Sequence, residues 1–258
     1  MDRLAVISSE SQRFADVLAD VDPDRRCPTC PDWSASDLLW HLTTVHFFWA
    51  EILERRMVDE SGLPDVERSK PQRPSATADM LALRQRATAR LTEQLSMKAD
   101  DDALWSWWPA DQTVGFTRRM QTYEATMHRV DAELTAGVPV SPIAQDVAGG
   151  AVDHAVDVMW GWMPDSATYQ PDCTVEFLAT DTDQRWLVEC GRWTAQDDED
   201  GLLQGRTARR GTDTPRAAVK APVVDLALWA WTRGGSVVTS GDPAAVAAIT
   251  AVEREGIQ

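Results

Sequence analysis

Two histidines and a glutamate have the residue types and spacing of a metal site. Glu124 and His128 lie four residues apart. Four residues turn an α-helix by about 400°, so both side chains leave one helix face. His41 lies in an earlier segment that is also expected to be helical. Two imidazoles and a carboxylate bind a divalent cation such as zinc and leave one coordination position open. We therefore predict a metal site at His41, Glu124 and His128.

Other polar residues in these segments are weaker candidates for metal ligands. His46 follows His41 by five residues, about 140° around the helix, so one cation does not easily take both. We expect His46 to be a cavity or bundle residue, and His154 to be a surface or interdomain residue. Asp131, one turn beyond His128, could accept the imidazole N–H or be a solvated charge. Without His41, the Glu124–His128 pair would be typical of an exposed helix surface.

The hydrophobic spacing predicts long helices over the first part of the chain. These helices are expected over residues 3–20, 35–57, 75–97 and 116–136, with a fifth over 142–162. Loops are expected over 59–74 and 99–115. Ser34 and Asp37 have the spacing of an N-terminal cap for the second helix. Four long helices joined by loops indicate a helical bundle.

The pattern changes after Pro164. Residues 173–180 and 185–194 alternate apolar and polar side chains, which is typical of strands. Beyond them we expect an exposed loop around a short strand over 196–216, helices over 223–232 and 243–255, and a short strand over 236–240. The prediction is an α+β fold, with a helical bundle over 1–165 and a smaller α+β domain over 166–258.

The composition excludes several function classes. The 258 residues carry a net charge of −16, and no basic run exists that could neutralise a nucleic-acid backbone. No segment has the apolar length of a membrane span, and the first residues do not read as a signal peptide. We therefore expect a cytoplasmic protein, without nucleic-acid or membrane partners. Four cysteines in a chain of this length do not indicate a disulfide scaffold.

Tryptophan and cysteine give two further features with open interpretations. Trp105, Trp107 and Trp108 cluster in the expected loop over 99–115; they are either apolar filler or the wall of a ligand cavity. Cys27 and Cys30 form a Cys-x-x-Cys pair, which could be a redox pair, half of a zinc site, or part of a rigid turn between prolines. We expect Cys30 to be a packed residue.

Three segments resemble the mycothiol-dependent maleylpyruvate isomerase family, which has a DinB-like metal-binding bundle. They are residues 30–42, 124–133 and 230–243. The resemblance implies that the positions of His41, Glu124 and His128 hold a divalent metal, usually zinc. It also implies mycothiol as the thiol co-substrate. Arg233 occupies the place of an arginine that helps to form the active site from the C-terminal domain.

These features together predict a metal-dependent enzyme that uses a thiol. A metal-bound thiolate would attack a small electrophilic substrate, giving either S-transfer or cis–trans isomerisation. Arg233 would orient an anionic group, and Trp105 and Trp108 would cover the bound thiol. The same ligands would also suit a hydrolase that activates water. A bundle that only binds a small molecule or protein is a further alternative. The ligand types do not separate zinc from nickel, iron or manganese, and the chain is expected to be a monomer or homodimer.

Overall fold

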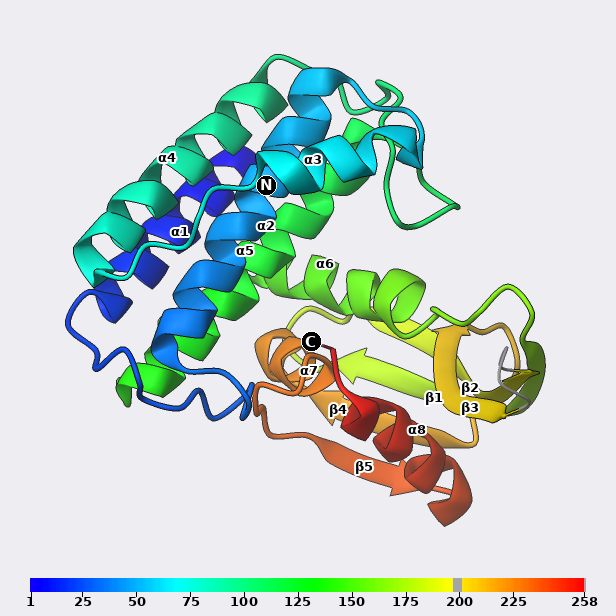
Figure 1. Cartoon of the computed structure of the whole chain (residues 1–258). Coiled ribbons are helices and arrows are strands. Elements are labelled where there is room, and N and C mark those ends of the chain that lie inside the picture. The colour runs from blue at the N-terminus through cyan, green and yellow to red at the C-terminus, as the bar shows by residue number, and fades with distance from the viewer. Residues whose placement is uncertain (197–200, 258) are drawn as a thin grey trace. The chain divides into compact units, whose positions relative to one another are not determined.

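The computed structural model describes residues 1–196 and 201–257, and the chain divides into two compact units (Figure 1). The first unit spans Met1–Pro142 and is helical; the second spans Ile143–Gln258 and contains a five-stranded sheet. The predicted α+β fold is therefore confirmed. None of the described helices combines the length and hydropathy that crossing a bilayer requires.

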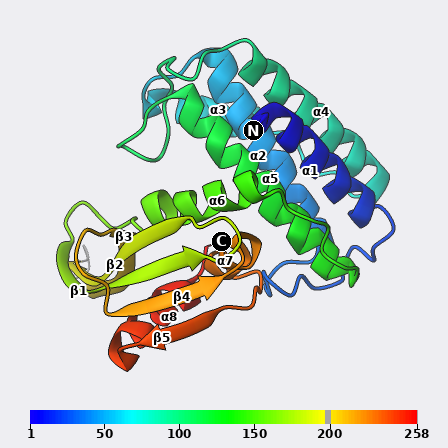
Figure 2. The same cartoon turned by 180° about the vertical axis from the view of Figure 1, so that it is seen from behind.

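Four long helices build the first unit (Figure 2). They are α1 (Arg3–Leu18), α2 (Ala35–Arg55), α4 (Thr77–Ser96) and α5 (Val114–Ala136). Helix α2 packs against α4 and α5, and α1 packs against the other sides of the same two helices. Their apolar faces meet in a core that includes Ile7, Phe14, Leu38, Leu42, Leu91 and Val130. Burial of these apolar faces supplies most of the stability of such a bundle.

Reciprocal hydrogen bonds set the start of α2, two turns before His41. Ser34 Oγ accepts from the backbone N–H of Asp37 at 3.1 Å, and Asp37 Oδ2 accepts from the backbone N–H of Ser34 at 2.9 Å. Arg73 Nη1 also donates to Asp37 Oδ1, at 2.8 Å. The Ser34 N–H and the Arg73 guanidinium lower the pKa of Asp37 to about 2. The predicted cap is thus present and determines where His41 lies along α2.

Helix α5 is bounded as the sequence indicated. Thr113 Oγ1 accepts from the backbone N–H of Phe116 at 3.1 Å, which caps the first turn. At the other end Gly137 has φ 72°, a conformation that glycine adopts without strain. Most of the helix is buried, including several polar residues. The polar residues of α5 therefore lie inside the unit, among other side chains.

The prediction of a loop over residues 59–74 is wrong for part of that segment. The segment 59–74 contains a 3₁₀ turn, η1 (Glu60–Gly62), and a short helix, α3 (Leu63–Ser69). Asp59 Oδ1 accepts from the backbone N–H of Ser61 at 2.9 Å and starts the turn. Pro64 then sits in the first turn of α3, where a helix needs no backbone N–H donor. A proline that suggested a break in the sequence instead begins a helix.

The second unit is built on a mixed sheet in the order β3-β2-β1-β4-β5. Its strands are β1 (Thr168–Ala179), β2 (Arg185–Gln196), β3 (Leu202–Arg210), β4 (Ala217–Ala221) and β5 (Val238–Gly241). Only the β1–β4 pair is parallel among the described strands; the other pairs are antiparallel. Two helices, α7 (Val223–Ala230) and α8 (Pro243–Glu255), complete the C-terminal part.

The expected exposed loop over 196–216 is replaced by more regular structure. Its residues form the nine-residue strand β3, and the unexpected strand β4 follows. The arginines that suggested a loop extend from β3 and form ion pairs, Arg209 with Glu189 at 2.8 Å and Arg210 with Asp157 at 2.6 Å. Pairing with β2 therefore overrides the charged local pattern. Residues 197–200 of the expected loop lie outside the described residues.

The fifth helix is shorter than expected and groups with the sheet. Helix α6 (Gln145–His154) is followed by η2 (Ala155–Met159), a segment with π-type hydrogen bonding. Trp231 Nε1 donates to the carbonyl of Ala151 at 2.9 Å, and Trp186 Nε1 donates to Asp153 Oδ1 at 2.8 Å. These bonds tie α6 to α7 and β2. The boundary between the compact units follows Pro142. The domain bounds of 1–165 and 166–258 stay a prediction.

The cap of α2 gives a pH-dependent stability prediction. Asp37→Asn removes the carboxylate, and we expect the free energy of unfolding to fall by about 1 kcal/mol at pH 7. The folded pKa of Asp37 is lowered from 3.8 to about 2. Its contribution is therefore present above pH 3.8 and is lost as the pH falls toward 2. Urea unfolding of the wild type, Asp37→Asn and the exposed Asp32→Asn control, from pH 6 to pH 3, measures this. A difference that stays constant across the range would contradict the assignment.

The turn after α7 gives a second stability prediction. Gly235 has φ 79°, and a Cβ there would lie 2.2 Å from the carbonyl oxygen of Asp225. Gly234 has φ 103°, but a Cβ there would meet no atom within 4 Å. We expect Gly235→Ala to destabilise the protein by about 2 kcal/mol more than Gly234→Ala, because it adds a backbone clash to the same kind of strain. Thermal unfolding of both variants measures the difference, and equal losses would rule out the clash.

Candidate metal centre

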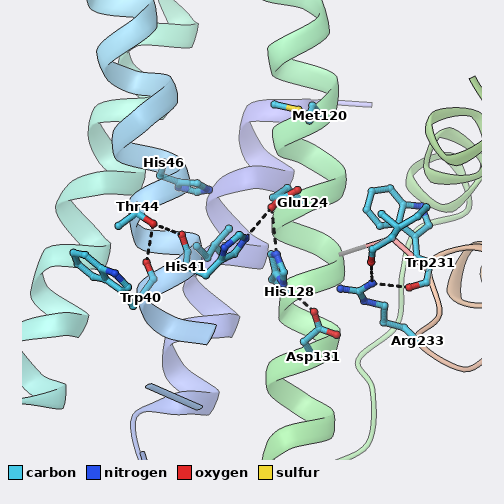
Figure 3. Close-up of polar contacts among 12 residues, drawn as sticks. Trp40, His41, Thr44, His46, Met120, Glu124, His128, Asp131, Trp231 and Arg233 are labelled. Carbon is cyan, nitrogen blue, oxygen red and sulfur yellow. Dashed lines mark hydrogen bonds and ion pairs between the residues drawn. The ribbon is translucent and has the colours of Figure 1, made fainter. Parts of the chain in front are cut away.

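His41 on α2 lies beside Glu124 and His128 on α5 (Figure 3). Glu124 Oε1 is 3.3 Å from His41 Nε2 and 3.2 Å from His128 Nε2. One ligand atom from each residue lies within 4.8 Å of the other two. Ligands bound tetrahedrally at about 2.1 Å are about 3.4 Å apart, so this spacing suits one small cation. Two imidazoles and a carboxylate are also the donors that zinc and similar ions prefer.

An indole ring packs against His41 at a tilt of 38°. The ring of Trp33 is centred 4.6 Å from that of His41 and 6.2 Å from that of His128. The backbone of Trp33 is itself held, because its N–H donates to the Cys30 carbonyl at 2.8 Å and its carbonyl accepts from Cys27 at 2.9 Å. Trp33 therefore limits the rotation of the His41 ring. No local pattern in the sequence indicated this contact between Trp33 and His41.

A buried carboxylate orients the second histidine. Asp131 Oδ2 is 2.8 Å from His128 Nδ1, and Thr29 Oγ1 donates to Asp131 Oδ1 at 2.5 Å. Asp131 is fully buried, so the alternative of a solvated charge is wrong. With its proton on Nδ1, the imidazole of His128 directs Nε2 toward Glu124. Carboxylates commonly fix the ring of a metal-binding histidine in this way.

The three residues hold one another through charge and hydrogen bonding. Burial acts to raise the pKa of Glu124, but hydrogen bonds with His128 and His41 hold it well below its usual value. Burial acts to lower the pKa of His128, but Asp131 and Glu124 outweigh it and raise that pKa to about 9. Without a cation, the positive charge of protonated His128 thus offsets part of the negative charge of the two carboxylates. A bound cation would take over that role, since it places positive charge between the same atoms.

The group is accessible from one side. The side chains of His41 and Glu124 are 30% and 22% exposed, whereas that of His128 is 5% exposed. The inner ligand is therefore anchored in the bundle, and the other two border solvent. Such an arrangement leaves room for a reacting group beside the cation, as an open metal site requires.

The tryptophan loop packs on the bundle near this group. Trp105 stacks on Trp49, with ring centres 6.0 Å apart, and Trp108 meets Trp107 edge to face at 6.0 Å. Trp107 Nε1 donates to the sulfur of Met120 at 3.2 Å, and Met120 lies one turn before Glu124 on α5. Trp107 is thus hydrogen-bonded to α5, the helix that carries Glu124 and His128. The sequence placed Trp107 in the loop but did not predict that it contacts the thiol. The contacts of Trp105 and Trp108 with a bound thiol stay a prediction.

Cys27 and Cys30 lie near Asp131, in the apolar core of the bundle. Both are buried and neither forms a disulfide. Their sulfur atoms and one oxygen of Asp131 lie within 4.8 Å of one another. A hydrogen bond from Cys30 lowers the pKa of Cys27 to about 5. Cys30 is the packed residue expected from the sequence, and the pair is a second group of potential ligands.

Arg233 belongs to the second unit and is buried there. Only 5% of the residue is exposed, and Nη1 donates to the carbonyls of Trp231 and Ile257, each at 2.6 Å (Figure 3). Arg233 is therefore not a surface residue. His154 is also buried, with its ring stacked on Trp231 at 6.2 Å. Of its two expected positions, the surface position is wrong and the interdomain position stays a prediction.

Comparison with known proteins identifies the family. Residues 4–133 match the profile of the mycothiol maleylpyruvate isomerase N-terminal domain. A crystal structure of the mycothiol-dependent maleylpyruvate isomerase is similar over 93% of both chains, with a TM-score of 0.59 and 14% identity. The crystal structure of a histidine-to-alanine mutant of that enzyme is similar over 93% of both chains, with a TM-score of 0.58 and 13% identity. No curated protein matches the sequence. Since the profile spans half of its length, the chain belongs to the mycothiol maleylpyruvate isomerase family.

Proposed function

We propose that the protein is a metal-dependent enzyme that uses mycothiol to transfer sulfur to, or isomerise, a small electrophilic substrate. One observation carries this proposal: His41, Glu124 and His128 present ligand atoms within 4.8 Å of one another, and two of these residues border solvent. Membership of a mycothiol-dependent enzyme family supports the choice of thiol.

The residues around the triad each have a task in this proposal. A divalent cation such as zinc, held by the triad, would stabilise the thiolate form of a thiol, which otherwise titrates near about 8.5. Asp131 accepts a hydrogen bond from the Nδ1–H group of His128, which keeps Nε2 available as a ligand. Trp33 holds the ring of His41 in place. Glu124 contributes a carboxylate whose low pKa keeps it charged at neutral pH.

Two further roles are proposed from the family resemblance. Arg233 would bind a carboxylate of the substrate or of the thiol, for which a planar guanidinium is suited. Trp105 and Trp108 would contact the bound thiol through their apolar rings. The cytoplasmic location, the lack of a nucleic-acid partner and the monomeric or homodimeric state stay predictions from the sequence.

Ligand substitution tests the metal assignment. After chelation and reloading, the wild type should bind one zinc ion per chain, measured by elemental analysis. His41→Ala and His128→Ala should each lose stoichiometric zinc, because two remaining ligands hold a zinc ion much more weakly than three. Glu93→Gln, an exposed change on α4, is the matched control and should keep the ion. Stoichiometric zinc in His128→Ala would show that the ligands are assigned wrongly.

Thiol dependence tests the reaction class. Zinc-loaded protein is incubated with mycothiol and a panel of small unsaturated or halogenated acids, and thiol loss and product mass are followed together. Thiol loss supports transfer when an unsaturated acid gains the mass of the thiol by addition, or when a halogenated acid gains the thiol and loses hydrogen halide. A rearranged product of unchanged mass, formed only with thiol present, supports isomerisation. Turnover of esters or amides without any thiol would instead favour a hydrolase, and an absence of metal would favour a bundle that only binds a ligand.

A further inference from the structure

Buried polar side chains continue the row of metal ligands along α5. Thr117, Gln121, Glu124 and His128 lie within about 60° of one another around the helix. Thr117 and Gln121 are fully buried. No described residue hydrogen-bonds to Thr117 Oγ1 or to either polar atom of the Gln121 side chain. Burying an unpaired amide is unfavourable, so these atoms indicate a missing hydrogen-bond partner.

The ring nitrogen Nδ1 of His46 on α2 is also buried without a hydrogen-bond partner among the described residues. Its Nε2 is 3.4 Å from Arg84 Nη2, and a guanidinium only donates, so Nε2 is the acceptor of this contact. Burial and the charge of Arg84 hold the pKa of His46 well below its usual value. The neutral ring therefore carries its proton on Nδ1. No described residue accepts from Nδ1, although His46 is fully buried.

The helix register places His46 and Gln121 at one level. Helices α2 and α5 run in opposite directions, and His41 meets the turn between Glu124 and His128 (Figure 3). Five residues along α2 advance about 7.5 Å from His41 to His46, and the same advance back along α5 reaches Gln121. Figure 3 shows the ring of His46 pointing from α2 toward α5. The charge of Glu124 also acts on His46, as expected for close neighbours.

An uncompensated positive charge lies directly behind His46. Arg84 is 1% exposed and donates to the Leu42 carbonyl and to Ser11 Oγ, each at 2.8 Å. Within the described residues, no carboxylate forms an ion pair with it. A buried charge without an ionic partner is unfavourable. Water could satisfy the unpaired donors, but it would not balance this charge. The charge therefore favours an anion next to His46.

We propose that His46 and Gln121 form a subsite for a carboxylate of the substrate, one turn from the metal centre. His46 Nδ1 and Gln121 Nε2 would each donate to the carboxylate, and Arg84 would balance its charge through His46. The inference rests on the proposed function and deepens it, because it names the two neutral donors that would position a carboxylate of the substrate beside the cation.

Titration with maleate, a small unsaturated dicarboxylate, tests the subsite. Binding to the whole protein is measured by calorimetry with and without zinc, and neutral dimethyl maleate is the second probe. Gln121→Leu and His46→Leu should each weaken maleate binding at least tenfold and leave ester binding unchanged. His46→Asn keeps an N–H near the Nδ1 position and should lose less. Thr43→Val, a buried change on α2 whose hydroxyl bonds only within its own helix, should bind like the wild type.

Folding of the variants does not decide the outcome. Gln121→Leu removes unpaired polar atoms at similar volume, so its unfolding temperature should not fall. Nuclear magnetic resonance of the wild type provides a second readout, since the Gln121 side-chain amide signal should shift on maleate addition. Maleate affinity that is equal in the wild type and Gln121→Leu, or no binding to the wild type at all, would overturn the subsite.

The same experiment separates the subsite from the proposed function. If the wild type binds zinc and mycothiol but all variants bind maleate equally, the subsite is wrong and the enzyme proposal stands. If the wild type binds no zinc but maleate binding depends on His46 and Gln121, the subsite stands and the metal-dependent function is wrong.

Discussion

The contact between α2 and α5 at Glu124 is the constraint on which the candidate site depends. One carboxylate oxygen meets an imidazole from each helix, so the helices are joined by polar atoms at the point where a cation would lie. Each imidazole has a further contact that fixes its orientation: His128 hydrogen-bonds with Asp131, and His41 packs against the Trp33 ring. Because the supports come from the segment before α2 and from α5 itself, the ligand geometry is part of the bundle packing.

This site uses a part of the bundle that is costly to build. A buried row of polar residues on α5 replaces apolar surface that would otherwise stabilise the core. Thr29, Asp131 and His128 satisfy one another, whereas His46 and Gln121 leave polar atoms unpaired. Bundles tolerate such positions where a ligand completes them. The paired residues are thus expected to position the metal ligands, and the unpaired residues are expected to meet substrate.

Sequence reasoning grouped Glu124 with His128 because their signal is local, and metal binding by these residues and His41 stays a prediction. Glu124 and His128 share a helix face by spacing alone, and Ser34 with Asp37 marks where α2 begins. The four bundle helices follow from apolar periodicity. Other features depend on residues that are distant in the chain, so no local pattern indicates them. They are the contact of Trp33 with His41, the neutral state of His46 and the burial of Arg233. The length of β3 was missed for the same reason: the sequence indicated only a short strand there, and pairing with β2 outweighs its charged sequence.

X-ray absorption at the zinc edge of the loaded protein tests the central claim most directly. The account predicts a shell of nitrogen and oxygen at about 2.0–2.1 Å, with the outer scattering of two imidazole rings and without sulfur in the absence of thiol. Addition of mycothiol should then introduce one sulfur at about 2.3 Å. The buried group of Cys27, Cys30 and Asp131 is the competing set of ligands. Two sulfur neighbours in the thiol-free protein would place the ion there and contradict the assignment to His41, Glu124 and His128.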